Sequence, residues 1–431
     1  MSQKFMELQV RFAYYVDKIR VLGPAWTIRW LTRRLAAEMM WVLLLPITVV
    51  AHLAGYRRVS IFVERIGHLA SELNCFLKER ALGRLPERRW FVVAPRGEVA
   101  NSCLLGYWKR HVTIVEDPWI CTVLSAMGRH GLMQFDISHY TPSSADKAAA
   151  NYYSVLATWG SRPPLLVLDA EHRERGWDEL QRMGIPRDAW FIAIHAREPG
   201  FSAQDESAHA HRNSDIRRLI PAIQEIGRRS GWVIRMGDPS MQSLSPLEGV
   251  VDYAHHPSRC DWMDVFLCAE ARFFVGNSSG LFFLATAFGK PCALANMIPS
   301  SHLAFAPADV SILKLIWSVR ENRYLTFNEI FNQPVADYRY ADLFTKDGLR
   351  VDENTEEELY GLVVEMLDRI DGCYSGTSDD DALQHWFFSL FRPAHFGYGA
   401  TGRVGSAFLR RHRDLLSPGT TSGPHMVATR Q

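Results

Sequence analysis

The sequence predicts an α/β protein with two doubly wound, Rossmann-like domains that face each other across a cleft, preceded by an apolar helical segment. Three observations favour this class. The chain has 431 residues, which is more than one ordinary hydrophobic core accommodates. Hydrophobic residues make up 47% of it and charged residues 22%, which is a globular composition. After Tyr56, short β-branched runs alternate with amphipathic segments, as in βαβ units with parallel strands.

The charge balance and the cysteines exclude several classes of protein. Lys and Arg total 48 and Asp and Glu total 47, so the chain has no broad basic field for a nucleic-acid backbone, and we expect no nucleic-acid partner. Seven scattered cysteines without a C-x-x-C pair predict reduced thiols in the cytoplasm rather than a zinc site or a disulfide framework.

The amino-terminal segment, residues 1–58, contains an apolar run from Met39 to Ala54 that is interrupted by Pro46. This run is shorter than the ~20 residues that a helix needs to span a bilayer. Arginines flank it on both sides, which favours a helix or bent hairpin lying in the membrane interface. A core helix buried on the first domain is an equally good interpretation. Both place the protein in the cytoplasm, and the first places it peripherally on the cytoplasmic face of the inner membrane.

The first Rossmann-like domain is predicted over residues 59–164 and begins with a strand at 59–64. A helix follows, with Leu69, Leu73 and Phe76 at helical spacing. The second domain is predicted over residues 165–330, with strands at 190–198, 232–238, 272–276 and 291–296. A helical region, 331–416, is expected to pack back on the domains, and the Ser-, Thr- and Gly-rich tail, 417–431, is predicted to be disordered.

Polar residues follow three predicted strands of the second domain, and ligands of open α/β sheets bind outside the carboxyl ends of the strands. A Gly/Ser turn at a helix start offers backbone N–H groups to phosphate, although a serine there is more often a simple helix cap. Arginine binds phosphate through a bidentate fork. A loop at 209–213 is expected at the same sheet edge. The resulting diphosphate cradle comprises His195, Arg197, Arg212, Asn213, Arg235, Gly237, Asp238, Asn277, Ser278, Ser279 and Gly280.

Several runs resemble a family of bacterial glycosyltransferases associated with surface-polysaccharide gene clusters. They are ERIGHLA, IHAREPG, HRNSDI, GWVIRMGDP and DVFLCAEARFFVGNSSGL, and they lie within residues 59–300. The resemblance implies the two-domain GT-B architecture and transfer of a sugar from a nucleotide-sugar donor to a glycan or lipid-linked acceptor. The H-x-R strand end is similar to that of fucosyltransferase-like enzymes, which implies that Arg197 binds the donor diphosphate.

The catalytic candidates are His68, Glu64 and Arg197. His68 would act as the general base for the incoming hydroxyl, and Glu64 and Glu98 are alternative bases. That His68 is only a residue at a helix start, with no catalytic role, is nearly as good an interpretation. Arg197 would stabilise the leaving diphosphate. No metal and no cofactor apart from the donor is expected. A nucleotide-sugar epimerase and a non-catalytic polysaccharide-assembly protein remain as alternatives.

Overall fold

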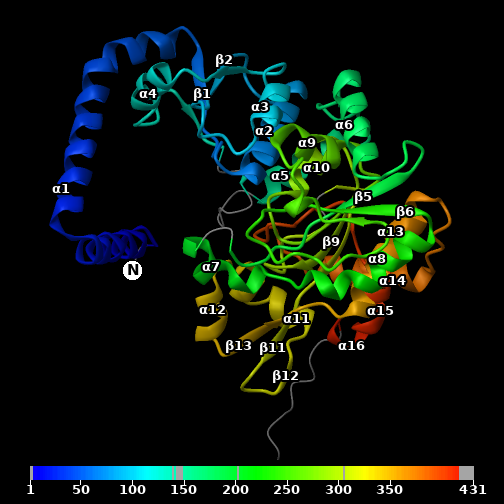
Figure 1. Cartoon of the computed structure of the whole chain (residues 1–431). Helices are drawn as coiled ribbons and strands as arrows, with labels where there is room; N and C mark the ends of the chain where they lie inside the picture. Colours follow the sequence, from blue (N-terminus) through cyan, green and yellow to red (C-terminus); the bar gives the residue numbers. More distant parts are fainter. Residues whose placement is uncertain (1–2, 138–139, 142–148, 201–202, 304–305, 417–431) are drawn as a thin grey trace, which may run out of the picture. The chain divides into compact units, whose positions relative to one another are not determined.

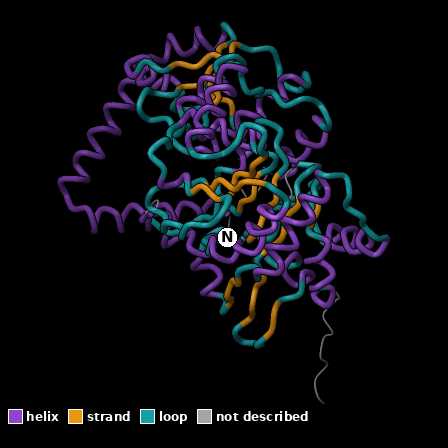
Figure 2. The backbone as a smooth tube through the Cα atoms, turned by 45° about the vertical axis from the view of Figure 1, so that its right-hand side comes forward, coloured by secondary structure: helices purple, strands orange, loops and turns teal. Residues whose placement is uncertain are grey.

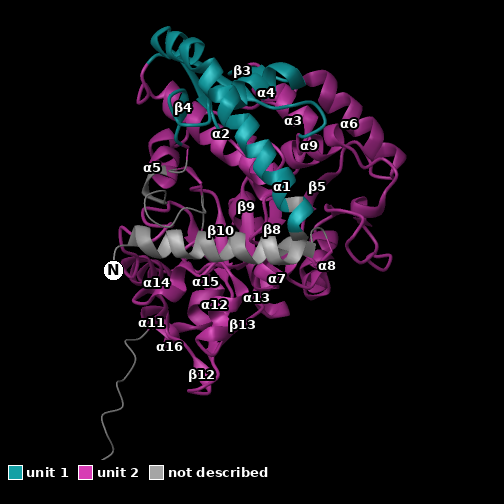
Figure 3. Cartoon of the chain, turned by 90° about the vertical axis from the view of Figure 1, so that its left-hand side faces the viewer, with its two compact units in different colours: residues 1–60, 87–98, 112–136 teal, residues 61–86, 99–111, 137–431 magenta. Residues whose placement is uncertain are grey.

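The computed structural model describes residues 3–137, 140–141, 149–200, 203–303 and 306–416, and the tail predicted to be disordered lies outside the described residues. The chain divides into two compact units, each assembled from several separate stretches of sequence (Figure 3). Unit 1 comprises Met1–Ser60, Glu87–Glu98 and Val112–Asp136, and unit 2 comprises Ile61–Pro86, Val99–His111 and Ile137–Gln431.

Unit 1 holds a parallel four-stranded sheet in the order β3-β2-β1-β4, with β1 at Tyr56–Val59, β2 at Arg89–Val93, β3 at Thr113–Val115 and β4 at Gln134–Phe135. Helix α4, Pro118–Met127, supplies Cys121 and Met127 to its core. The first strand was predicted at 59–64, and the structure corrects this. The register pairs Tyr56 with Arg89, so the basic start of β1 belongs to the sheet because of tertiary pairing.

Helix α1 runs from Gln3 to Leu53 and continues through Pro24 and Pro46. Its section from Thr27 to Leu53 is 27 residues long and apolar enough to cross a membrane, and only 6% of its most apolar window is buried. This section is therefore mostly exposed, with Leu44 and Ala51 packed on the core of unit 1, and the apolar helix is longer than the predicted run.

Unit 2 is built on a seven-stranded parallel sheet in the order β14-β10-β9-β8-β5-β6-β7 (Figure 1). Read along the chain from β5, the first six strands follow the doubly wound order 3-2-1-4-5-6. Together with the sheet of unit 1, this order confirms the predicted α/β class with parallel sheets. The strands are β5 (Trp190–Ile194), β6 (Gly231–Arg235), β7 (Val250–Val251), β8 (Phe274–Gly276), β9 (Cys292–Met297), β10 (Val310–Leu313) and β14 (Arg403–Val404).

Helices cover both faces of this sheet and connect its strands (Figure 2). Among them, α13 packs against α8, and α2 packs against α10. The helices of unit 2 are α2 (Ile66–Ala81), α3 (Ser102–Trp108), α5 (Ala149–Trp159), α6 (Ala170–Arg182), α7 (Ala203–His209), α8 (Ile220–Arg228), α9 (Asp261–Glu270), α10 (Phe282–Ala287), α11 (Phe327–Phe331), α12 (Ala341–Lys346), α13 (Glu356–Ile370), α14 (Ser378–Ser389), α15 (Ser406–Arg411) and α16 (Arg413–Leu416).

The region beyond residue 300 contains more strand than its sequence indicated. A three-stranded antiparallel sheet, β12-β11-β13, is formed by Arg323–Tyr324, Leu315–Ser318 and Leu349–Asp352. The predicted helical region 331–416 therefore also supplies β13, and it supplies β14, the edge strand of the large sheet. Strands of two to four residues escape periodicity analysis because they hold too few residues to show an alternating pattern.

Two glycines bring α2 and the start of α10 into contact within unit 2. A Cβ atom added to Gly67 would lie 2.7 Å from the Cα atom of Gly280, and one added to Gly280 would lie 2.9 Å from the Cα atom of Gly67. These distances are too short for any side chain, so both positions require glycine. The first turn of α2 is thereby fixed against the turn that precedes α10.

The Gly67→Ala substitution should destabilise the protein by about 1–3 kcal/mol, because the new methyl group meets backbone that cannot move aside cheaply. Chemical denaturation measures the change. Gly106→Ala is the matched control, since Gly106 lies within α3 and has open space where its Cβ would be. Equal stability of Gly67→Ala and wild type would contradict the observed packing.

Candidate active site

The candidate site lies where the strand order of the large sheet reverses, between β5 and β8. The two strands pair in parallel through Ile194 and Val275, and the backbone N–H of His195 donates to the Val275 carbonyl at 2.9 Å. The connections from β5 and β8 leave toward opposite faces at such a switch point, which opens a crevice at the carboxyl edge. The structure therefore brings the predicted segments at 195–197 and 277–280 together.

Asn277 ties three chain segments together at this edge. Its side chain is 2% exposed. The Oδ1 atom accepts the backbone N–H of Arg197 at 3.2 Å, and Nδ2 donates to the Arg212 carbonyl at 3.1 Å and to the Ser214 hydroxyl at 2.8 Å. The Asn277 amide thus joins the loop after β5 and the segment at 212–214 to the turn after β8.

Arg197 extends from the end of β5 toward the loop at 206–213. Its Nη1 atom donates to the His209 carbonyl at 3.3 Å and to Oδ1 of Asn213, and its Nη2 atom lies 3.8 Å from Oε2 of Glu206. Asn213 in turn donates to Glu206 at 2.6 Å. The side chain of Arg197 is 18% exposed, so its charge lies at the border between protein and solvent. This position suits a group that binds an anion.

The serine turn is held by hydrogen bonds between side chains and backbone groups. Arg212 donates from Nε to the Ser278 carbonyl at 2.8 Å. The Ser278 hydroxyl accepts the Ile298 N–H at 2.9 Å, and the Ser279 hydroxyl accepts the Leu281 N–H at 3.4 Å. Helix α10 has six residues. A helix this short has a small dipole, so the expected contribution of its amino terminus to phosphate binding is corrected downward.

Arg235 does not have the open position that the sequence suggested. Its side chain is fully buried, and its Nη2 atom donates to Glu198 Oε1 at 2.8 Å. Its Nη1 atom donates to both carboxylate oxygens of Asp252 at 3.1 Å. Two carboxylates neutralise the guanidinium, and burial keeps it away from any ligand in this conformation. We therefore leave Arg235 out of the ligand-binding set and assign it to the stability of the sheet edge.

The other predicted residues after β5 and β6 are uncharged or engaged in the turn. Burial lowers the pKa of His195 to about 4, and its Nδ1 atom lies 3.2 Å from the Met236 carbonyl, so the ring is neutral near pH 7. The Gly237 carbonyl accepts a hydrogen bond from Arg259 at 2.9 Å. Asp238 accepts the Ser240 N–H at 2.9 Å. These residues shape the edge, and none of them adds a cation to it.

Lys314 is a cation of this site that the sequence analysis missed. It directly follows β10, is 3% exposed, and donates from Nζ to the Asn213 carbonyl at 2.5 Å. Burial lowers its pKa to about 8. The sequence feature that could have indicated it is a lysine directly after the short run VSIL at 310–313. The strands of this region were too short to be predicted from periodicity. Lys314 and Arg197 thus reach Asn213 from two different strand ends.

His68 lies in the first turn of α2 and not at the end of a strand. Its Nδ1 atom is 2.6 Å from Oε1 of Glu72, one helical turn later. Glu72 is fully buried, and the same oxygen accepts the Thr141 hydroxyl at 2.7 Å. The buried carboxylate of Glu72 thus orients the imidazole of His68. The i, i+4 spacing of the two residues could have indicated this pairing. Glu64 is exposed in the turn before α2 and takes no part in this pair.

The contact between Gly67 and Gly280 places this His68–Glu72 pair beside the Asn277–Gly280 turn, in the same compact unit. His68 is adjacent to Gly67 in sequence, so its imidazole starts from backbone that touches the candidate anion site. The side chain of His68 is 26% exposed, and the ring packs edge-on against Phe62. The predicted base and the predicted anion site are therefore neighbours.

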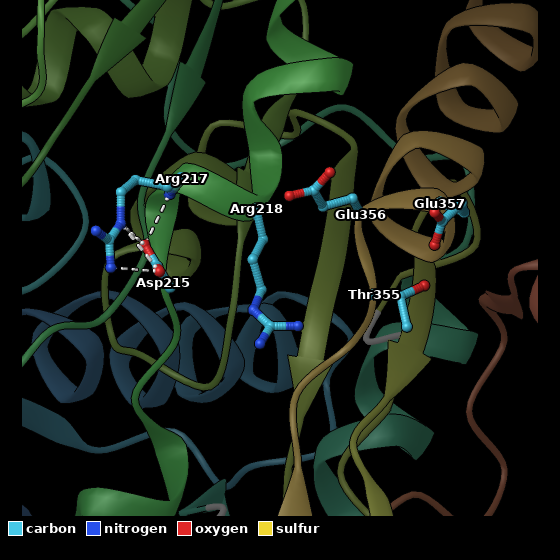
Figure 4. Close-up of a pocket in the computed structure, with 6 residues that line it drawn as sticks. All are labelled: Asp215, Arg217, Arg218, Thr355, Glu356 and Glu357. Atoms are coloured by element: carbon cyan, nitrogen blue, oxygen red, sulfur yellow. Dashed lines mark hydrogen bonds and ion pairs between the residues drawn. The ribbon is translucent and has the colours of Figure 1, made fainter.

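A pocket of about 450 Å³ opens beside the same edge (Figure 4). It lies where η3, Ile216–Leu219, meets the start of α13. Asp215 binds the Arg217 guanidinium in this pocket, and its own N–H donates to Glu353 at 3.0 Å. The residues that line it are Asp215, Arg217, Arg218, Thr355, Glu356 and Glu357.

Within the part of the chain that the structure describes, no group of three or more His, Cys, Asp or Glu side chains could hold a metal ion. His209 lies 3.1 Å from the Arg339 carbonyl through Nδ1, and His211 packs against Phe344 with ring centroids 5.2 Å apart. Both histidines therefore contact the segment at 339–344.

Comparison with protein-family models and with curated proteins finds no match. Among solved structures, the chain is similar to a family 9 glycosyltransferase from Veillonella parvula, with 11% identity, a TM-score of 0.40, and coverage of 60% of this chain and 86% of that one. It is also similar to ADP-heptose LPS heptosyltransferase II of Escherichia coli, with 13% identity, a TM-score of 0.37, and coverage of 60% and 90%.

A third similarity is to the iron-containing dodecameric glycosyltransferase TibC of enterotoxigenic E. coli, with 13% identity, a TM-score of 0.33, and coverage of 59% of this chain and 62% of TibC. All three TM-scores lie below 0.5, so these similarities assign no activity to this chain. Its function has to be derived from its own residues.

Replacing Lys314 by Met should change how stability depends on pH. The pKa of Lys314 is about 8 in the folded protein, against an ordinary value of 10.5. Between about pH 8 and pH 10.5 the unfolded chain binds more protons than the folded chain does. Wild type therefore gains stability relative to Lys314→Met as the pH rises through this interval. Denaturant unfolding of both proteins at several pH values measures this. A difference in unfolding free energy that is independent of pH would contradict the burial of the ammonium group.

Proposed function

We propose that the chain is a glycosyltransferase that moves a sugar from a nucleotide-sugar donor to a glycan or lipid-linked acceptor in surface-polysaccharide biosynthesis. The observation that carries this proposal is the convergence of Arg197, Arg212 and Lys314 on Asn213 and on the Asn277–Ser278 turn at the switch point of the large sheet. Cations that converge at this position of a doubly wound sheet favour a phosphorylated ligand.

In the proposed reaction, the acceptor hydroxyl attacks the anomeric carbon of the donor. The new carbon–oxygen bond forms as the bond from that carbon to the diphosphate oxygen breaks, and the nucleoside diphosphate leaves with the bonding electrons. Negative charge therefore grows on the diphosphate in the transition state. Arg197 and Lys314 would stabilise that charge from fixed positions, which is how preorganised donors accelerate a reaction.

The proton of the acceptor hydroxyl would pass to His68. In the tautomer that donates from Nδ1 to the Glu72 carboxylate, Nε2 carries the lone pair that accepts this proton. The buried carboxylate of Glu72 would then stabilise the imidazolium that forms. Glu72 acts through His68 in this scheme and is a positioning residue.

The nucleoside is proposed to occupy the pocket at Asp215. Its volume of about 450 Å³ lies within the range of small-molecule sites. Carboxylates such as Asp215 and Glu357 can accept hydrogen bonds from ribose hydroxyls, and the Arg218 guanidinium can stack on a base. The pocket adjoins the cation cluster through the continuous chain Asn213–Asp215. Protein cations would meet the charge of the diphosphate, so the proposal needs no metal ion.

Arg197→Ala and Lys314→Met should each weaken the binding of a nucleoside diphosphate by about tenfold to a hundredfold, the usual loss for one charge-assisted hydrogen bond. Binding to wild type should also weaken as the pH rises above about 8, because Lys314 then loses its proton. Titration calorimetry with UDP, GDP, ADP and TDP, and with CMP for donors linked through one phosphate, measures both effects.

The matched control for this titration is Arg187→Ala. Arg187 is an exposed arginine whose guanidinium pairs with Glu174 and Asp178, and it lies just before β5, at the opposite end of that strand from Arg197. This control should bind as wild type does. Unchanged affinity in both Arg197→Ala and Lys314→Met would contradict the proposed diphosphate site.

His68→Ala should lower kcat by about a hundredfold to ten-thousandfold, the usual contribution of a general base, and should leave nucleotide affinity unchanged. Glu72→Gln should lower kcat less, since it removes the carboxylate that orients the His68 imidazole. Sugar transfer with and without acceptor, in the presence of EDTA, is the assay.

The same assay separates the alternatives. An epimerase would convert the donor without any acceptor, whereas an assembly protein would show no turnover in wild type. Full activity of His68→Ala would show that another group accepts the proton.

A further inference from the structure

The carboxyl-terminal half of α1 exposes a continuous apolar face. The exposed positions recur every three or four residues, so they share one side of the helix. Leu43 is 77% exposed and Leu53 is 79% exposed. Single exposed leucines are common on protein surfaces, but a continuous exposed apolar face marks an interaction site. The face includes Leu35, Met39, Leu43, Ile47, Val50 and Leu53.

A neighbouring face of the same helix packs on the rest of unit 1. Leu44 and Ala51 pack against the core cluster of Phe91, Val93, Cys121, Met127 and Met133. Glu38 accepts hydrogen bonds from Arg129 at 2.8 Å and lies 2.7 Å from His130 Nε2. A helix that crossed a bilayer would have to leave this core and carry the ionised Glu38 into hydrocarbon. The packing thus favours a helix that lies along a membrane over one that spans it.

Helix α4 adds a second exposed apolar group to unit 1. Its first turn presents Trp119, which is 83% exposed, together with Ile120, while Cys121 and Met127 face the core that α1 covers. Figure 3 shows α4 beside α1 within this unit. Tryptophan is the side chain most enriched at the boundary between lipid and water.

The charges on α1 complement an anionic lipid surface. Arg29, Arg33 and Arg34 are exposed at the start of the apolar section, and the Arg34 guanidinium lies 5.2 Å from the centre of the Trp30 ring. The one carboxylate between Thr27 and Leu53 is Glu38, whose charge is balanced by its two basic partners. Arginines and an indole beside an exposed apolar surface bind the headgroup region of anionic bilayers.

We propose that unit 1 is a membrane-docking module that binds an anionic lipid surface with α1 in the plane of the membrane and with the first turn of α4 as a second contact. The partner is a bilayer that contains anionic phospholipid. This inference uses residues of unit 1 alone and is independent of the proposed sugar transfer. It adds a location for the reaction, because a lipid-linked acceptor would be concentrated on the same surface.

The test is sedimentation of the full-length chain with vesicles, without any sugar substrate. Wild type should bind vesicles of phosphatidylcholine mixed with an equal amount of phosphatidylglycerol more tightly than vesicles of phosphatidylcholine alone. The double variants Leu43→Asp/Val50→Asp and Trp119→Ala/Ile120→Ala should each lose about tenfold or more in partitioning. Sodium carbonate should release bound wild type, since a helix lying in the plane has no span to anchor it.

The matched control is Val319→Asp, which places one such charge at a 61% exposed valine of unit 2 and should bind as wild type does. The changed side chains are exposed, so thermal unfolding of all variants should match wild type. Binding by both double variants at wild-type strength would overturn the proposal. The proposal would also be overturned if carbonate did not release bound wild type. It would be overturned as well if wild type did not bind vesicles and light scattering showed dimers formed through α1.

Discussion

The Asn277 side-chain amide is the interaction on which the candidate site depends. Strands β5 and β8 are neighbours in the sheet, yet their connections leave in opposite directions, and the loops that follow have no ladder to hold them. Asn277 binds the backbone of Arg197, the backbone of Arg212 and the hydroxyl of Ser214 from one buried position. It therefore sets where the cations stand relative to one another, and the Gly67–Gly280 contact then sets where His68 stands relative to them.

Charge at this edge is divided between structure and ligand binding. Arg235 is fully buried, and its two Nη atoms pair with Glu198 and Asp252, so its removal would leave two carboxylates without their guanidinium partner. Arg197 and Lys314 are placed differently, because one lies at the solvent border and the other donates to a carbonyl oxygen. An arginine at a strand end is thus an ambiguous signal. The number of carboxylates that surround it decides whether its charge remains available to a ligand.

Periodicity predicted the parallel sheets and the location of the long strands of unit 2, because each carries a run of buried β-branched or aromatic residues. It did not predict where they end, since β5 stops at Ile194 and β6 at Arg235, before the predicted ends at 198 and 238. It did not predict the partners of Arg235, since Glu198 and Asp252 become neighbours only when β5, β6 and β7 align. Lys314 was missed because β10 has four residues. The pairing of Glu72 with His68 could have been predicted from their i, i+4 spacing. The burial of Glu72 could not, because it follows from packing between α2 and α5, which are distant in sequence.

Hydrogen–deuterium exchange in the presence and absence of a nucleoside diphosphate tests the central claim most directly, because it reports where a ligand binds without altering a residue. We expect slower exchange of backbone amides at 195–198, 206–215 and 277–281, the segments that Asn277 joins, and unchanged exchange in β1 to β4 of unit 1. Protection confined to other segments, or no protection at saturating ligand, would contradict the placement of the donor site at the switch point between β5 and β8.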